Sequence, residues 1–227
     1  MTSLLFPDLA EARDSGAGRL APDWRPGVAG ADWPWGDLAP GAYDVIVADP
    51  PWNFGLWSQR GEGKSAQAHY ACQGLDWIKA LPVRLLARPN ALLLLWGIWP
   101  MLATGDVIDV ARAWGFVPVS GGSWAKRYRS GKLRWGTGYV IRSTAEPFLI
   151  AVDETSAPFL VARIGEPDGC PSLSCHVDGL AREHSRKPDE FYSALVKATP
   201  GRRRCDLFNR EPRAGFDVWG DETGKFG

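Results

Sequence analysis

Unbroken runs of apolar residues along the chain predict strands. Residues 43–48 (Tyr-Asp-Val-Ile-Val-Ala) are rich in β-branched side chains, and residues 91–96 (Ala-Leu-Leu-Leu-Leu-Trp) form a second such run. Runs of this kind are typical of strands buried on both faces, as in parallel sheets. We predict further strands at residues 117–119, 123–125, 148–152 and 205–208.

Apolar residues at helical spacing lie between these runs. Lys187-Pro188-Asp189-Glu190 also has the features of a helix start, with a proline at the first helical position and acidic residues in the first turn. We predict helices at residues 75–81, 83–87 and 101–114, and one that begins near residue 187. Strands that alternate with helices predict a three-layer α/β domain over residues 41–227.

Residues 1–40 differ in composition from the rest of the chain. They are rich in Gly, Pro and Ala and contain Trp24, Trp33 and Trp35. We predict an irregular arm that packs through these tryptophans. The first residues lack a basic segment followed by an apolar one, and residues 91–96 are far shorter than the roughly 20 residues of a membrane helix. We therefore expect a cytoplasmic protein.

Charge and cysteine content limit the function classes. The chain has 26 basic and 26 acidic residues, so any contact with a polyanion must come from a local patch. Without a secretory signal, we expect reduced thiols at the four cysteines. Cys170, Cys175 and His176 do not match a common zinc spacing, and we predict no metal site.

The motif Asp49-Pro50-Pro51-Trp52 directly follows the first predicted strand. Ligands of open α/β sheets bind beyond the carboxyl ends of the strands, although a rigid turn would also explain the two prolines. The amine of adenine is a poor nucleophile because its lone pair is delocalised into the ring. Asp49 and the Pro50 carbonyl could accept its two hydrogens, and Trp52 could stack on a flipped-out base.

Further motifs make the chain similar to a known family. From Tyr43 to Glu222 the chain resembles the family of the eukaryotic messenger-RNA adenine methyltransferase and its bacterial and phage relatives. The resemblance implies a Rossmann-like methyltransferase domain with a mostly parallel sheet, in which the catalytic motif precedes the elements that bind S-adenosylmethionine. The motifs are Asp49–Trp52, His69-Tyr70, Leu81-Pro82-Val83, Leu93–Gly97, Trp114-Gly115-Phe116, Trp124-Ala125-Lys126, Gly138-Tyr139, Arg182–Glu190, Leu207–Arg210 and Trp219–Glu222.

The resemblance also assigns residues to roles. Lys187 would approach the carboxylate of the cofactor, and Asp221 and Glu222 would lie near its ribose hydroxyls. The full set of expected cofactor-binding residues is Asp32, Lys187, Asp206, Leu207, Phe208, Asn209, Arg210, Arg213, Asp221 and Glu222. The resemblance places Tyr70, Lys126 and Glu146 around the target base.

Residues 126–135 are the densest positive stretch of the chain. Basic side chains alternate there with aromatic ones, a pattern that suits phosphate contact and base stacking. A solvated surface loop is the plainer alternative, but the position beside Lys126 favours contact with nucleic acid. The expected substrate contacts in this loop are Arg127, Arg129, Lys132 and Arg134.

Together these features predict an enzyme that transfers a methyl group in line to the N6 amine of adenine in a nucleic acid. The short chain is similar to the bacterial and phage relatives, which favours DNA over RNA. Two alternatives are a catalytically silent subunit that only grips nucleic acid, and a methyltransferase for an amide side chain or free nucleotide. A single domain with a Trp-rich arm could also pair with itself or with another chain.

Overall fold

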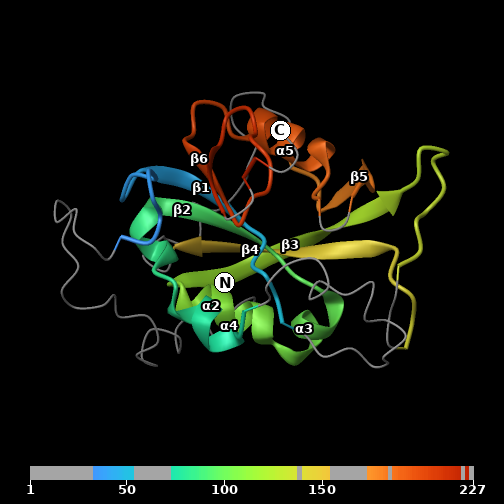
Figure 1. Ribbon diagram of the computed structural model, residues 1–227, viewed down its shortest axis with the longest axis horizontal. Coiled ribbons are helices and arrows are strands. Elements are labelled where there is room, and N and C mark those ends of the chain that lie inside the picture. Colours follow the sequence, from blue (N-terminus) through green and yellow to red (C-terminus); the bar gives the residue numbers. More distant parts are fainter. Residues whose placement is uncertain are drawn as a thin grey trace, which may run out of the picture.

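The computed structural model describes residues 33–53, 73–136, 140–153, 173–183, 186–220 and 223–224. Their strands form a seven-stranded sheet with the order β5-β3-β4-β2-β1-β6-β7 (Figure 1). The strands are β1 (Tyr43–Ala48), β2 (Ala87–Trp96), β3 (Phe116–Arg127), β4 (Ala145–Asp153), β5 (His176–Leu180), β6 (Arg204–Leu207) and β7 (Asp217–Trp219).

Strand direction determines which ends of the strands meet. β1 pairs in parallel with β2 and β6, and the pairs β3–β5 and β6–β7 are parallel as well. β4 is antiparallel to both of its neighbours, β2 and β3. The mostly parallel sheet is therefore confirmed. The carboxyl ends of β1, β2, β3 and β6 share one edge with the amino end of β4.

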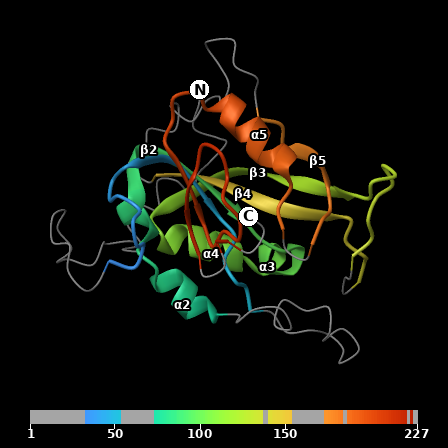
Figure 2. The same cartoon turned by 45° about the horizontal axis from the view of Figure 1, so that its top comes forward.

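Helices cover both faces of the sheet, which confirms the three layers. The α-helices α2 (Leu75–Ala80), α3 (Trp99–Thr104) and α4 (Asp106–Ala113) and the 3₁₀-helix η3 (Val83–Leu86) belong to one side, and α5 (Asp189–Ala198) packs on the other. Figures 1 and 2 show α2, α3 and α4 on one side of the sheet and α5 on the other.

The alternation of side chains along the strands explains why both faces need a cover. Ile46 and Leu93 belong to the apolar cluster under α4, whereas Val47 and Leu94 belong to the cluster under α5. Successive residues of a strand point to opposite faces. The unbroken apolar runs of β1 and β2 thus supply both cores.

Several elements differ from the sequence prediction. The helix predicted at residues 101–114 is two helices, because Gly105 adopts a φ of 89° between α3 and α4. The strands predicted at residues 117–119 and 123–125 are parts of the single strand β3. Pro188 is the N-cap residue of α5 and not its first helical residue. β5 and β7 were not predicted, since both are short and partly exposed.

The described end of the N-terminal arm packs through its tryptophans. Trp35 is fully buried, with its ring edge-to-face against Trp219 at 4.8 Å and its Nε1 donating to the Pro82 carbonyl at 3.3 Å. Trp33 donates to the Leu38 carbonyl at 3.0 Å. Trp24 lies outside the described residues, and a boundary near residue 40 stays a prediction. None of the described helices is long and apolar enough to cross a membrane.

Candidate functional site

Asp49 lies at the carboxyl end of β1, next to the end of β6. Its backbone N–H donates to the Leu207 carbonyl at 3.3 Å, which joins the two strand ends. Two further backbone bonds hold the motif: Trp52 N–H donates to the Pro50 carbonyl at 2.7 Å, and Gln73 N–H donates to the Pro51 carbonyl at 2.9 Å. The backbone that presents the Asp49 carboxylate is therefore held from both sides.

Trp52 anchors this motif in the core. Only 4% of the residue is exposed, and its Nε1 donates to the Trp96 carbonyl at 3.0 Å. The structure gives the ring a packing role, and stacking on a base stays a prediction. A carbonyl oxygen has two lone pairs, so the Pro50 oxygen keeps one acceptor site beyond its bond from Trp52.

Four charged side chains form an alternating row beside the motif. Lys187 Nζ lies 2.6 Å from Asp49 Oδ2 and 2.8 Å from Glu146 Oε1. Lys126 Nζ lies 2.6 Å from the other oxygen of Glu146, Oε2. The row joins β1, β3, β4 and the segment before α5, and the Lys187 side chain is only 4% exposed. Residues predicted for separate cofactor, base and catalytic roles thus meet in one place.

The row moves the pKa values of its two carboxyl groups in opposite directions. Burial raises the pKa of Asp49, although the charge of Lys187 opposes this shift. Burial acts on Glu146 in the same sense, but Lys126 and Lys187 together lower its pKa to about 2. Burial works against the charge of Lys187, yet its two carboxylate partners raise its pKa. Glu146 therefore stays ionised at neutral pH, and Asp49 is the better proton acceptor.

Another carboxylate of this region, Asp206, is buried on β6. Only 2% of it is exposed, and it accepts hydrogen bonds from the Asn209 amide and the Tyr192 hydroxyl. Arg213 Nε is 3.6 Å from its Oδ2 atom. Burial raises the pKa of Asp206 to about 7, against the opposing charge of Arg213.

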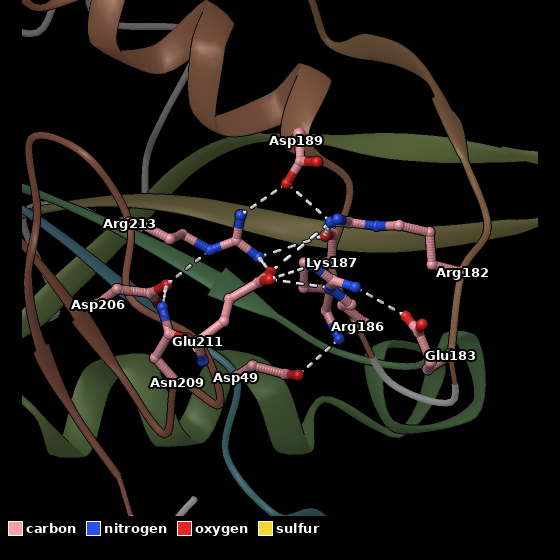
Figure 3. Close-up of polar contacts among 10 residues, drawn as sticks. All are labelled: Asp49, Arg182, Glu183, Arg186, Lys187, Asp189, Asp206, Asn209, Glu211 and Arg213. Atoms are coloured by element: carbon pink, nitrogen blue, oxygen red, sulfur yellow. Dashed lines mark hydrogen bonds and ion pairs between the residues drawn. The ribbon is translucent and has the colours of Figure 1, made fainter. Parts of the chain in front are cut away.

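Glu211 is a member of this region that the sequence analysis missed. Its carboxylate pairs with Arg213, Arg182 and Arg186 (Figure 3). Both Arg182 and Arg213 also donate to the backbone carbonyl of Lys187, at 2.9 and 3.3 Å. Glu211 thereby ties the loop after β6 to the segment that carries Lys187. The only local signal was an acidic residue among arginines, which by itself does not predict burial.

The remaining predicted cofactor residues have different environments. Leu207 is fully buried in the core, and Arg210 is half-buried. Phe208 adopts a φ of 63°, which is rare for an aromatic residue, and its ring lies edge-to-face with Trp219 at 5.3 Å. Such backbone outliers cluster at functional sites. Asp32, Tyr70, Asp221 and Glu222 lie outside the described residues.

The structure divides the basic loop into two kinds of residue. Arg127 Nε lies 2.6 Å from Asp178 Oδ1, and Arg134 donates to the carbonyls of Ala181 and Arg182 at 3.3 and 3.0 Å. These two arginines hold the loop against the segment around β5. The other two predicted contacts, Arg129 and Lys132, are exposed. Contact with a phosphate is thus best supported for these two.

The sequence predicted no metal site at Cys170, Cys175 and His176. Cys170 lies outside the described residues, Cys175 is an exposed free thiol, and His176 Nε2 is 3.7 Å from Asp178 Oδ2. Across the described part of the chain, no three His, Cys, Asp or Glu side chains are grouped so that they could hold a metal ion.

The mostly parallel seven-stranded sheet with helices on both faces is consistent with a Rossmann-like methyltransferase fold. The chain belongs to the MT-A70 family, whose model matches residues 43–222. The family resemblance inferred from the motifs is thereby confirmed.

The chain matches relatives that differ in how much of their own length the similarity covers. It is 28% identical over 178 residues to the human N(6)-adenosine-methyltransferase catalytic subunit METTL3, covering 75% of this chain and 26% of METTL3. A putative N(6)-adenosine-methyltransferase MT-A70-like protein of Medicago truncatula is 26% identical over 75% of this chain and 24% of its own length. Type II methyltransferase M.MunI of Mycoplasma sp is 24% identical over 79% of this chain and 77% of its own length. The chain thus spans about a quarter of the length of the first two relatives.

Proposed function

We propose that this chain transfers a methyl group from S-adenosylmethionine to the N6 amine of adenine in a nucleic acid, with DNA favoured over RNA. The observation that carries the proposal is the position of Asp49, which begins the Asp-Pro-Pro-Trp motif at the carboxyl end of β1 and pairs with Lys187 at 2.6 Å. Membership of the MT-A70 family and the names of its methyltransferase relatives support it.

The preference for DNA is supported by the extent of the matches. The similarity covers 77% of M.MunI but only 26% of human METTL3. The resemblance associates the bacterial and phage members of the family with DNA, and M.MunI of Mycoplasma sp is a bacterial relative. RNA is the alternative substrate, and the names of the longer relatives support it.

The residues beside Asp206 fit a methyl donor of this kind. Arg213 Nε is buried without a hydrogen-bond partner, because 3.6 Å to Asp206 is too long for such a bond. A buried unpaired donor costs about 1–3 kcal/mol unless a ligand satisfies it. S-adenosylmethionine supplies an electrophilic methyl group. Its carboxylate matches the cationic donors Lys187 and Arg213, and its ammonium and hydroxyl groups match the acceptor Asp206.

The chain's own residues would prepare the amine for attack. The Asp49 carboxylate accepts one amine hydrogen and the free lone pair of the Pro50 carbonyl accepts the other, which returns electron density to the nitrogen. The raised pKa of Asp49 suits it to take the proton that is lost during or after transfer, with water as the other acceptor. Lys187, which also pairs with Glu146, holds Asp49 in place, so much of the rate enhancement comes from positioning.

A methyl-transfer assay tests this proposal. The protein is incubated with labelled S-adenosylmethionine and matched DNA or RNA oligonucleotide pools, and the methylated nucleoside is identified. We expect N6-methyladenine in the DNA pool, and a rate about 10²- to 10⁴-fold lower for Asp49→Asn. Asp109→Asn is the control, because that carboxylate is 56% exposed on α4. Calorimetric titration should show that Asp49→Asn still binds the cofactor.

Other outcomes of the assay identify the alternatives. Methylation of the RNA pool alone would reverse the substrate preference. Transfer to free adenosine or to a peptide amide, but to neither pool, would contradict a nucleic-acid substrate. Oligonucleotide binding with neither transfer nor cofactor binding would favour a catalytically silent subunit.

A further inference from the structure

The connection between β3 and β4 concentrates positive charge. Residues 128–144, which join the two strands, contain four Lys or Arg residues and no Asp or Glu, in a chain whose basic and acidic residues are equal in number at 26 each. Figure 1 shows this connection projecting beyond the body of the sheet. A segment with charge of one sign attracts a partner of the opposite sign.

An exposed tryptophan stands on this segment with an arginine beside its ring. Trp135 is 56% exposed, and the guanidinium carbon of Arg142 is 5.7 Å from its ring centroid. Arg142 Nε donates to the Gly136 carbonyl at 3.1 Å, and Gly136 N–H donates to the Ser143 carbonyl at 2.6 Å. The backbone on both sides of the pair is therefore tied together, while the ring remains open to solvent.

The base of the connection is rigid. Arg127 is held by Asp178, and Arg134 by the carbonyls of Ala181 and Arg182. These contacts fix the segment at its root, whereas Trp135 belongs to neither of the two apolar clusters of the described residues. Five of the seven large apolar side chains that are exposed in the described residues belong to this connection, and a concentration of exposed apolar side chains marks a site for a partner. They are Tyr128, Leu133, Trp135, Val140 and Ile141.

We propose that Trp135 and Arg142 form a stacking platform for a base that flanks the target adenine. The inference deepens the proposed function, because it requires a nucleic-acid substrate. The aromatic face binds a base through stacking, as in proteins that bind single strands, and the guanidinium contacts the adjacent phosphate. A cationic segment that contains no acidic residue suits such a strand and disfavours a basic protein partner.

The platform lies within reach of the site. Ser143, which closes the loop around the pair, is three residues before Glu146, a distance of about 10 Å along an extended chain. Glu146 itself contacts Lys187, the partner of Asp49. The platform is therefore expected to take a base within a few nucleotides of the adenine and not the adenine itself.

Kinetics with Trp135→Ala test the platform. With a 20-nucleotide single-stranded substrate that holds one adenine, we expect KM to rise about 5- to 150-fold while kcat stays unchanged. Trp135→Phe should restore most of the affinity, because it keeps an aromatic face. Val140→Ala is the matched control: this side chain on the same connection is 97% exposed but has no ring, so its removal should leave KM as in the wild type.

Abasic substitutions locate the contact. Removing the base at successive flanking positions should weaken wild-type binding at one or two of them, and Trp135→Ala should be insensitive at those same positions. Equal losses for Trp135→Ala and the wild type at every position would overturn the inference. A change of oligomeric state in Trp135→Ala on gel filtration, with unchanged KM, would instead assign the patch to a second copy of the chain.

The failure of this inference is distinguishable from failure of the proposed function. If the wild type transfers methyl groups and Trp135→Ala has the same KM, the inference is wrong and the proposed function stands. If the wild type transfers nothing, fluorescence anisotropy with the same oligonucleotides decides the matter. Weaker binding by Trp135→Ala than by Val140→Ala would then support the platform, and equal binding would refute it.

Discussion

Two charged regions of this protein are built in opposite ways. Beside Asp49, carboxylates and ammonium groups alternate, each within 2.8 Å of a partner, and the central Lys187 is almost wholly buried. In the β3–β4 connection the charges are all positive, and Arg129 and Lys132 are exposed. The first region balances its charge internally, and the second requires an external counter-charge.

This difference indicates that the two regions have different functions. A charge-balanced row around the buried Lys187 holds its groups in fixed positions, which is what positioning of two reactants requires. An exposed positive segment gains little stability for the fold but can attract a polyanion before docking. Mutations should therefore affect stability and chemistry in the first region, and substrate affinity in the second.

The largest effect should follow from Lys187→Met. Removing the ammonium leaves Asp49 and Glu146 facing each other without their shared partner, which should lower the free energy of unfolding by about 3–5 kcal/mol. Denaturant unfolding at neutral pH measures this change. In Lys79→Met the lost partner is the exposed Asp109, so the loss should be below about 1 kcal/mol. Equal losses in the two variants would contradict the contrast between buried and exposed charge.

A pH-dependent effect should come from Asp206. Because its folded-state pKa of about 7 lies above the ordinary value, the folded protein binds this proton more tightly than the unfolded chain. The stability that this proton contributes is complete below about pH 4 and is lost as the pH rises through 7. Relative to Asp206→Asn, the wild type should thus lose up to about 4 kcal/mol between pH 4 and 8.

Unfolding curves measured at several pH values check this prediction. Asp109→Asn should follow the wild-type pH dependence, since its carboxylate is exposed. An identical pH dependence for the wild type and Asp206→Asn would show that Asp206 is not protonated in the folded state near neutral pH.

A smaller effect is expected for Glu211→Gln. The amide cannot neutralise Arg182, Arg186 and Arg213, and we expect the free energy of unfolding to fall by about 2 kcal/mol. Because two of these arginines hold the Lys187 carbonyl, kcat should fall with it, while the KM for nucleic acid should change little. Glu183→Gln, which changes a more exposed partner of Arg186, should leave both quantities nearly unchanged.

The smallest effects should appear in the basic connection. Arg129→Gln and Lys132→Gln should each reduce the slope of log affinity against log salt by about 1, with the free energy of unfolding unchanged. Binding of the same oligonucleotide at several salt concentrations provides the slope. A slope that neither variant alters would remove both residues from the phosphate contacts.

Local sequence patterns were sufficient to predict much of the fold. The unbroken apolar runs of β1 and β2 predicted buried strands, and the Asp-Pro-Pro-Trp motif was correctly placed at a strand end. Short elements with weak patterns were not predicted: β7 has three residues, and β5 alternates exposed and buried positions over five. Gly105 was not expected to divide a helix, because a single glycine is also tolerated inside one.

The sequence by itself determined the strand–helix alternation, the motif at the end of β1 and the excess of positive charge at residues 126–145, since each depends on residues close together in the chain. Only the tertiary structure decided which distant charges meet. Asp49 and Lys187 are 138 positions apart, and their 2.6 Å contact depends on strand order and direction. The tertiary structure also decided that Arg127 and Arg134 support the connection between β3 and β4, while Trp135 stays exposed. Burial and pairing depend on packing between elements, which no local pattern encodes.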